Sequence, residues 1–299
     1  MINDITLENL STKESLRLST DGDGKFILDE EGVDWGNVKA SIYTYKSPKQ
    51  VGNEISGVDI ESRTILIVGW IYGTEEQIQE AQFWLGTFII PTEQIKVKVK
   101  EYHIIGQPIS IPQFGKSKQQ NNEYMCRFVI DLYCGNPEFV RSNPNVVEYG
   151  TTKPGFVFPF HFLEGGPGVT FGTVEIKTVQ KVVNAGIHST GGTITFKCLG
   201  ESIRNPKLFD VYDPSKYILI NKTLTYGEVV TINTNNNEQD ITGILENVES
   251  DYFRYWDFNN TWIQFERGVS YFGIEYEGPG NALEVQIEFS DSYLAIEGM

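Results

Sequence analysis

The three histidines, His103, His161 and His188, are the side chains best suited to acid–base or metal chemistry near neutral pH. Each stands alone, because the sequence has no His-Glu-x-x-His, no Cys-x-x-Cys and no two histidines at ligand spacing. Walker loops, Rossmann glycine fingerprints and serine nucleophile elbows are also missing. We therefore predict no catalytic residue, no metal site, no cofactor, and a protein that is not an enzyme.

Carboxylates are the most abundant reactive groups, with 40 Asp and Glu against 24 Lys and Arg. A glycan or peptidoglycan hydrolase needs only two of them, about 5 to 10 Å apart across a sugar, and so remains an open alternative. No pair is singled out by the sequence. The run Asp21-Gly22-Asp23-Gly24 resembles the start of a calcium loop, but Gly32 occupies the twelfth position, where a glutamate ligand is required. We interpret this run as a hairpin turn.

The acidic balance argues against nucleic acid as a partner, because a formal net charge of −16 repels phosphates. No run approaches the roughly 20 apolar residues of a membrane helix. The first four residues show no signal peptide, so we expect synthesis in the cytoplasm and no membrane partner.

The cysteines form a sparse, odd set of three: Cys126, Cys134 and Cys198. This set predicts buried reduced thiols rather than disulfides.

An aromatic cluster between residues 252 and 262 suits saccharide binding, because polar Asp and Asn side chains lie beside it. Its candidate contact residues for a sugar or a protein partner are Tyr252, Tyr255, Trp256 and Trp262. The same residue types fill sandwich cores and protein interfaces. We favour the core or interface interpretation and keep a carbohydrate-binding module or adhesin, contacting host cell-wall saccharide, as the alternative function.

The elements that must position these groups are mostly short strands. The segment Arg63–Trp70 predicts a buried strand, and Ile95–Lys100 alternates strictly between apolar residues and lysines. One helix interrupts them: Thr74 and Gln77 form a capping box at its start, and Gly86 is placed to end it. Its apolar stripe of Ile78, Ala81 and Leu85 faces a core.

The second half reads as an antiparallel sandwich, because strands recur at short intervals between turn signals. The clearest strands are 193–198, 217–220, 229–232 and 283–289. A length of 299 residues favours two domains. We predict an all-β protein with an N-terminal domain at 1–140, a linker at 141–168 and a C-terminal domain at 169–299.

The order of these signals resembles the siphovirus distal tail protein (Dit) family, a component of the phage tail tip and baseplate hub. The C-terminal half carries the succession Val183-Asn184-Ala185-Gly186, strand 193–196, Gly200, Asn205-Pro206, Tyr226-Gly227-Glu228 and Asn233-Thr234. The N-terminal half adds the helix, a following hairpin, the strand 127–134 ending in Asn136-Pro137, and Phe158-Pro159-Phe160 in the linker.

This resemblance implies a structural protein of the virion tail tip. The N-terminal β-sandwich-like domains would form a homohexameric ring, with an extended β-arm reaching the neighbouring subunit, and a galectin-like β-sandwich would follow. The implied partners are further copies of the chain, the tail tube protein, a tail-associated or tail fibre hub protein and a receptor-binding protein. We assign the arm to 95–111, through β-augmentation. Its candidate residues are Ile95, Val97, Val99, Tyr102, Ile104, Ile109 and Ile111.

Overall fold

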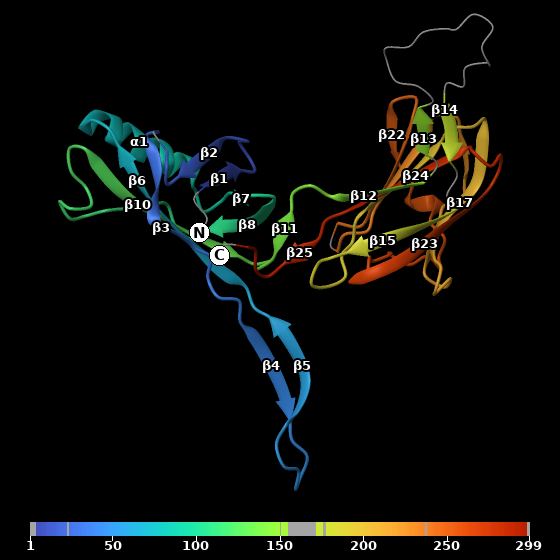
Figure 1. The fold of residues 1–299 in the computed structure, drawn as a ribbon, viewed down its shortest axis with the longest axis horizontal. Coiled ribbons are helices and arrows are strands. Elements are labelled where there is room, and N and C mark those ends of the chain that lie inside the picture. The colour runs from blue at the N-terminus through green and yellow to red at the C-terminus, as the bar shows by residue number, and fades with distance from the viewer. Residues whose placement is uncertain are drawn as a thin grey trace, which may run out of the picture. The chain divides into compact units, whose positions relative to one another are not determined.

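The structure is a computed structural model that describes residues 4–22, 24–149, 151–154, 172–175, 178–236 and 238–297. The chain divides into two compact units (Figure 1): unit 1 comprises Met1–Ser142 and Tyr293–Met299, and unit 2 comprises Asn143–Ser292. The C-terminal end of the chain therefore belongs to unit 1. Most of the expected linker, residues 155–168 with His161, lies outside the described residues.

The body of unit 1 is an antiparallel sheet whose strands run in the order β2-β1-β7-β8-β10-β6-β3. Its side chains alternate between core and solvent, as in β10, because successive residues of a strand point to opposite faces. The bounds are β1 Asp4–Asn9, β2 Ser15–Ser19, β3 Phe26–Asp34, β6 Arg63–Tyr72, β7 Ile95–Val99, β8 Tyr102–Pro108, β9 Gln113–Phe114, β10 Met125–Cys134, β11 Phe139–Arg141 and β25 Ser292–Tyr293.

The segment that joins β2 to β3 contains the run predicted to be a hairpin turn. The two strands pair with different neighbours, β2 with β1 and β3 with β6, so the segment is a connecting loop. Asp23 lies outside the described residues. The hairpin interpretation was wrong because a turn signal marks a change of direction and does not specify which strands pair.

The helix α1 spans Glu75–Phe88 and covers the core of unit 1 with Ile78, Ala81, Leu85 and Phe88. Both bonds of the predicted capping box are present, between Thr74 and Gln77. The predicted end at Gly86 was two residues early, because the helix continues through Phe88. Phe88 is buried and stacks on Trp84 at 5.0 Å, which gives the last turn a packing partner.

Two antiparallel sheets of unit 2 share one core, and β13 pairs with β14 in a separate two-stranded sheet, which confirms the expected all-β class. One sheet runs β12-β24-β16-β20-β21-β22, and the other runs β15-β23-β17-β18 with β19 also on β17. The bounds are β12 Asn145–Tyr149, β13 Thr151–Pro154, β14 Gly172–Glu175, β15 Val179–Asn184, β16 Thr193–Cys198, β17 Ser202–Asp210, β18 Tyr217–Leu219, β19 Thr223–Thr225, β20 Val229–Asn233, β21 Asp240–Leu245, β22 Val248–Asp251, β23 Gly268–Glu277, β24 Leu283–Phe289 and the short 3-10 helix η1 Phe253–Tyr255. Among the described residues, no helix is long and apolar enough to cross a membrane.

Candidate functional site

The segment predicted to be an arm lies within the sheet of unit 1. Strand β7 is paired with β1 on one side and with β8 on the other, so its backbone groups already have partners. Four of the predicted side chains are fully buried in the core: Ile95, Val97, Val99 and Ile104. A strand in this position has no edge to offer to a neighbour, so its placement does not fit an arm.

The other three predicted arm residues have different surroundings. Tyr102 packs edge-on against Tyr293 at a ring distance of 5.6 Å, within unit 1. Ile109 and Ile111 follow β8 and are more than half exposed. Apolar residues and lysines alternate in β7 because one face of the sheet is buried and the other faces solvent. On the solvent face, Lys98 forms an ion pair with Glu8 at 2.5 Å.

The features of an arm occur instead in a hairpin formed by β4 (Ala40–Tyr45) and β5 (Glu54–Ile60). These strands form a two-stranded sheet of their own, separate from the other sheets of the unit (Figure 1). Nearly every residue of the hairpin is exposed, although an isolated two-stranded hairpin is marginally stable in water. We call residues 40–60 the arm.

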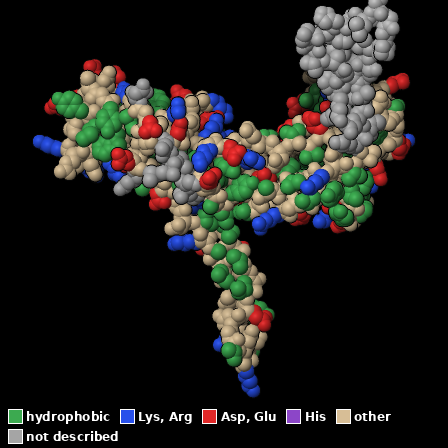
Figure 2. Space-filling model, in the orientation of Figure 1, with side chains coloured by type: hydrophobic (Ala, Val, Ile, Leu, Met, Phe, Trp, Pro, Cys, Tyr) green, Lys and Arg blue, Asp and Glu red, His purple; other side chains and the backbone are tan. Residues whose placement is uncertain are grey.

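One face of the arm is apolar. The register pairs Ala40 with Ile60 and Ile42 with Val58, and a bulge before Thr44 brings Ile55 to the same side. The large apolar side chains of this face are 50–64% exposed: Ile42, Ile55, Val58 and Ile60. Hydrophobic side chains run along the arm in Figure 2, and Lys or Arg side chains stand at its tip. A contiguous exposed apolar face of this kind indicates an interaction surface.

The opposite face of the arm is held by cross-strand hydrogen bonds. The Tyr45 hydroxyl donates to the Glu54 carboxylate. The Asp59 carboxylate, accepting from Tyr43, raises the pKa of that hydroxyl. These bonds join β4 to β5 without help from a core, so the arm keeps its ribbon form outside the body of the unit.

The root of the arm is anchored by Arg63, which is 2% exposed. Its guanidinium donates to the carbonyls of Trp35 and Leu294, and lies 4.9 Å from the centre of the Phe139 ring. Lys100 Nζ also donates to the carbonyl of Glu297 at 2.9 Å. The C-terminal segment therefore fastens the base from which the arm starts.

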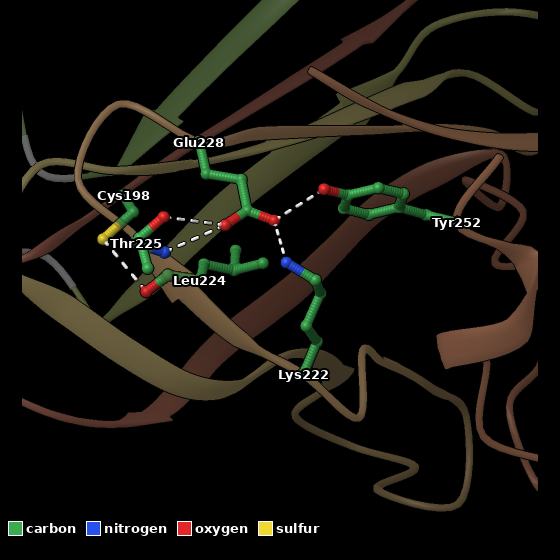
Figure 3. Close-up of polar contacts among 6 residues, drawn as sticks. All are labelled: Cys198, Lys222, Leu224, Thr225, Glu228 and Tyr252. Carbon is green, nitrogen blue, oxygen red and sulfur yellow. Dashed lines mark hydrogen bonds and ion pairs between the residues drawn. The ribbon is translucent and has the colours of Figure 1, made fainter. Parts of the chain in front are cut away.

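A buried polar cluster in unit 2 resembles a catalytic group in its residue types (Figure 3). The Glu228 carboxylate is fully buried and accepts from Lys222 Nζ, from the Tyr252 hydroxyl at 2.8 Å, and from the backbone N–H and hydroxyl of Thr225 at 3.0 and 3.2 Å. Cys198 lies beside it, with Sγ 3.6 Å from the carbonyl oxygen of Leu224.

The charge balance of this cluster favours a structural role. Burial raises the pKa of Glu228, but hydrogen bonds from Lys222, Thr225 and Tyr252 outweigh burial and leave that pKa below its ordinary value. The nearby cavity is lined by Thr225, Tyr226 and Gly227 among others, but not by Glu228 or Lys222. All contacts of the carboxylate described above go to protein groups, so its clear effect is to tie the β19–β20 turn to Tyr252.

The predicted saccharide aromatics pack against the core of unit 2. Tyr252 is 5% exposed and its hydroxyl is bonded to Glu228, while Tyr255 meets its ring at 5.2 Å. Trp256 and Trp262 stack at 4.4 Å and are partly buried against the same core. These positions fit the core interpretation, since Trp256 and Trp262 cover a face of each other and both pack against the core.

Of the two histidines that the structure describes, His103 is the more enclosed. It lies in β8, with Nδ1 3.1 Å from the Ser142 hydroxyl. Burial, together with the nearby charges of Lys96 and Lys98, lowers the pKa of His103 to about 4. Within the described residues, no group of three or more His, Cys, Asp or Glu side chains is arranged to hold a metal ion.

We predict that unit 1 loses stability as the pH falls from about 6.5 to about 4, because His103 is protonated more easily in the unfolded state. An unfolded histidine titrates near pH 6.5 and His103 in the folded chain near 4, so the unfolded state takes up the proton first. The contribution is therefore complete above about pH 6.5 and is lost as the pH approaches about 4. Urea unfolding at about pH 7 and about pH 4.5 should show a smaller acid loss in His103→Gln than in wild type. An unchanged acid loss would contradict the assignment, and His188→Gln is the matched control.

The sequence matches no family model and no curated protein. The fold, in contrast, is similar over nearly the whole chain to solved phage structures. The SPP1 Dit protein, described as a paradigm of the hub adsorption apparatus in phages infecting Gram-positive hosts, has a TM-score of 0.64 and 12% identity, over 96% of this chain and 98% of that chain. Chains of the phage P2 baseplate in its activated conformation, with calcium or with strontium, have TM-scores of 0.53 and 0.51 and 11% identity, over 96% and 97% of this chain and 98% of each. The expected Dit-like fold is therefore confirmed.

Proposed function

We propose that this protein is a non-enzymatic structural component of a bacteriophage tail tip, in which six copies form a ring that joins the tail tube to the host-adsorption apparatus. The supporting observation is the match of both units, in one chain, to hub and baseplate proteins of phages. Fold alone does not determine function, so the proposal also needs a surface suited to assembly.

The arm supplies that surface. Its apolar face stays in water in a single copy, at a cost of roughly 25 cal/mol for each Å² of apolar area. A ring removes this cost for every subunit at once, because each arm finds the same surface on the next copy. Such a ring needs a head-to-tail contact, in which the arm of one copy meets a different surface of the next copy.

The partners of the ring are proposed on the same basis. One side of the ring would receive the tail tube protein, and the other a tail-associated or tail fibre hub protein, with a receptor-binding protein attached. The virion tail tip would be its location after synthesis in the bacterial host cytoplasm. The acidic charge of −16 suits assembly with basic partner surfaces and opposes contact with the genome.

The full-length protein provides the test. Native mass spectrometry should give a species of six times the 33.8 kDa chain mass, and negative-stain class averages should show six-fold symmetry. Dilution should release single copies, since the interfaces involve no disulfide: the three cysteines are free and buried. A protein that stays single at high concentration, or that degrades cell-wall polymer, would overturn the proposal.

A further inference from the structure

The tip of the arm is basic in an acidic protein. The turn between β4 and β5, residues 46–53, holds Lys46 and Lys49 and no carboxylate, whereas the whole chain carries 40 acids against 24 bases. Lys46 and Lys49 are exposed on the turn between β4 and β5. Val51, next to them, is fully exposed.

The tip is also held in a defined shape. The backbone N–H of Gln50 donates to the Ser47 carbonyl at 3.1 Å, and Gln50 Oε1 accepts from the N–H of Ser47 at 2.9 Å. Its Nε2 reaches the Glu54 carboxylate at 3.1 Å. These bonds define the backbone of the turn that carries Lys46 and Lys49.

A cavity of about 750 Å³ in unit 1 has the complementary chemistry. It lies between α1 and the loop that leads into β10, and its lining carries the carboxylates Glu75 and Glu123, with one cation, Lys118. Four side-chain amides and the 73%-exposed ring of Tyr124 complete its polar and aromatic wall; the amides belong to Gln79, Gln82, Asn121 and Asn122. Side-chain amides can bond an extended backbone, and an aromatic face suits lysine stems.

We propose that this cavity receives the tip of the arm from a second copy of the chain, with Lys46 and Lys49 facing Glu75 and Glu123. The charges are complementary, the cavity volume falls in the range of about 300 to 1,000 Å³ of binding pockets, and the exposed Val51 supplies an apolar contact. This assignment rests on the proposed ring, and it names the acceptor surface for the tip. The seven residues of β5 extend the tip roughly 23 Å from the root, a reach suited to a neighbour.

Charge exchange tests the contact in the full-length protein. Lys46→Glu with Lys49→Glu should weaken assembly roughly tenfold or more, measured as the dissociation constant by sedimentation, because like charges then meet in the cavity. Glu75→Lys with Glu123→Lys should do the same. All four changes together should restore assembly to near the wild-type constant, and Lys181→Glu, an exposed charge in unit 2, is the control.

The outcomes separate this inference from the ring itself. If the wild type assembles and the reversed variants assemble equally well, or the fourfold variant is no better than either pair, the cavity is not the acceptor and the ring stands. If the wild type never assembles, the proposed function fails and this inference fails with it. Urea unfolding of each variant shows that the exposed substitutions leave the fold intact.

Discussion

Replacing residues 40–60 with a two-residue Asn-Gly turn will give a folded protein that no longer assembles. The ends of the arm are already adjacent, because the backbone N–H of Glu61 donates to the Lys39 carbonyl at 2.9 Å. A tight turn can therefore close the gap without moving β3 or β6. No arm residue belongs to the hydrophobic core of unit 1, so the urea midpoint should stay near that of the wild type.

The expected loss of assembly is large. The apolar face of the arm exposes half or more of each of four large side chains, and covering them contributes about 1 kcal/mol each. About 4 kcal/mol for each interface corresponds to roughly a thousandfold in the dissociation constant. Sedimentation of the deletion variant should show single copies at concentrations where the wild type forms rings.

The two faces of the arm provide a matched pair of variants. Ile42→Ser with Val58→Ser removes apolar contact from one face, and Tyr43→Ser, on the opposite face, leaves that contact in place. The first variant should weaken assembly by roughly thirtyfold, for about 2 kcal/mol of lost apolar contact, and the second by much less. Rings that persist in the deletion variant would show that the arm is not the joint between copies.

Sequence reasoning located most strands and the helix, because those elements have strong local signals. The capping box at Thr74 and the alternation in β10 and β24 each depend on neighbours a few residues away. The same logic assigned the arm to 95–111, whose strand β7 lies inside the sheet of unit 1. Segment 95–99 alternates strictly, but alternation reports only that a strand has two unlike faces and does not show whether the strand lies inside a sheet.

The two segments, 40–45 and 95–99, differ in whether their apolar face packs against the core of unit 1. The inner face of β7 meets the core of unit 1, and the apolar face of the arm meets nothing within its own unit. No property of the five or six residues themselves encodes this difference, because pairing partners come from distant parts of the chain.

The sequence singled out the Tyr226-Gly227-Glu228 motif, but only the structure shows what its residues contact. Gly227 adopts a φ of 78°, which permits the turn between β19 and β20, and the turn directs the next side chain inward. The partner hydroxyl comes from Tyr252, 24 residues away. Pattern reasoning grouped that tyrosine with its aromatic neighbours in a core or an interface but could not name its partner, since a buried hydrogen bond leaves no trace in spacing.

Glu228→Gln will lower the free energy of unfolding of unit 2 by about 3 kcal/mol, because it leaves the Lys222 ammonium facing a neutral amide in a mostly buried site. Hydrogen exchange of the β16 and β20 amides, which surround the cluster, measures this loss within unit 2 alone. Glu249→Gln, on the exposed strand β22, is the control and should change the exchange by less than about 0.5 kcal/mol.

Two further measurements show whether Glu228 stabilises unit 2 through its charge or through its packing. The folded pKa of Glu228 lies below its unfolded value, so its contribution is present above the unfolded pKa and is lost as the pH falls through the folded one. The wild type should therefore lose hydrogen-exchange protection in acid, and Glu228→Gln should lose less.

Replacing both partners, with Glu228→Met and Lys222→Met, should lower the free energy of unfolding by less than Glu228→Gln alone, because no unpaired charge remains buried. If the double variant is the least stable of the three, the cluster acts through more than charge pairing, and the electrostatic account of the turn is wrong.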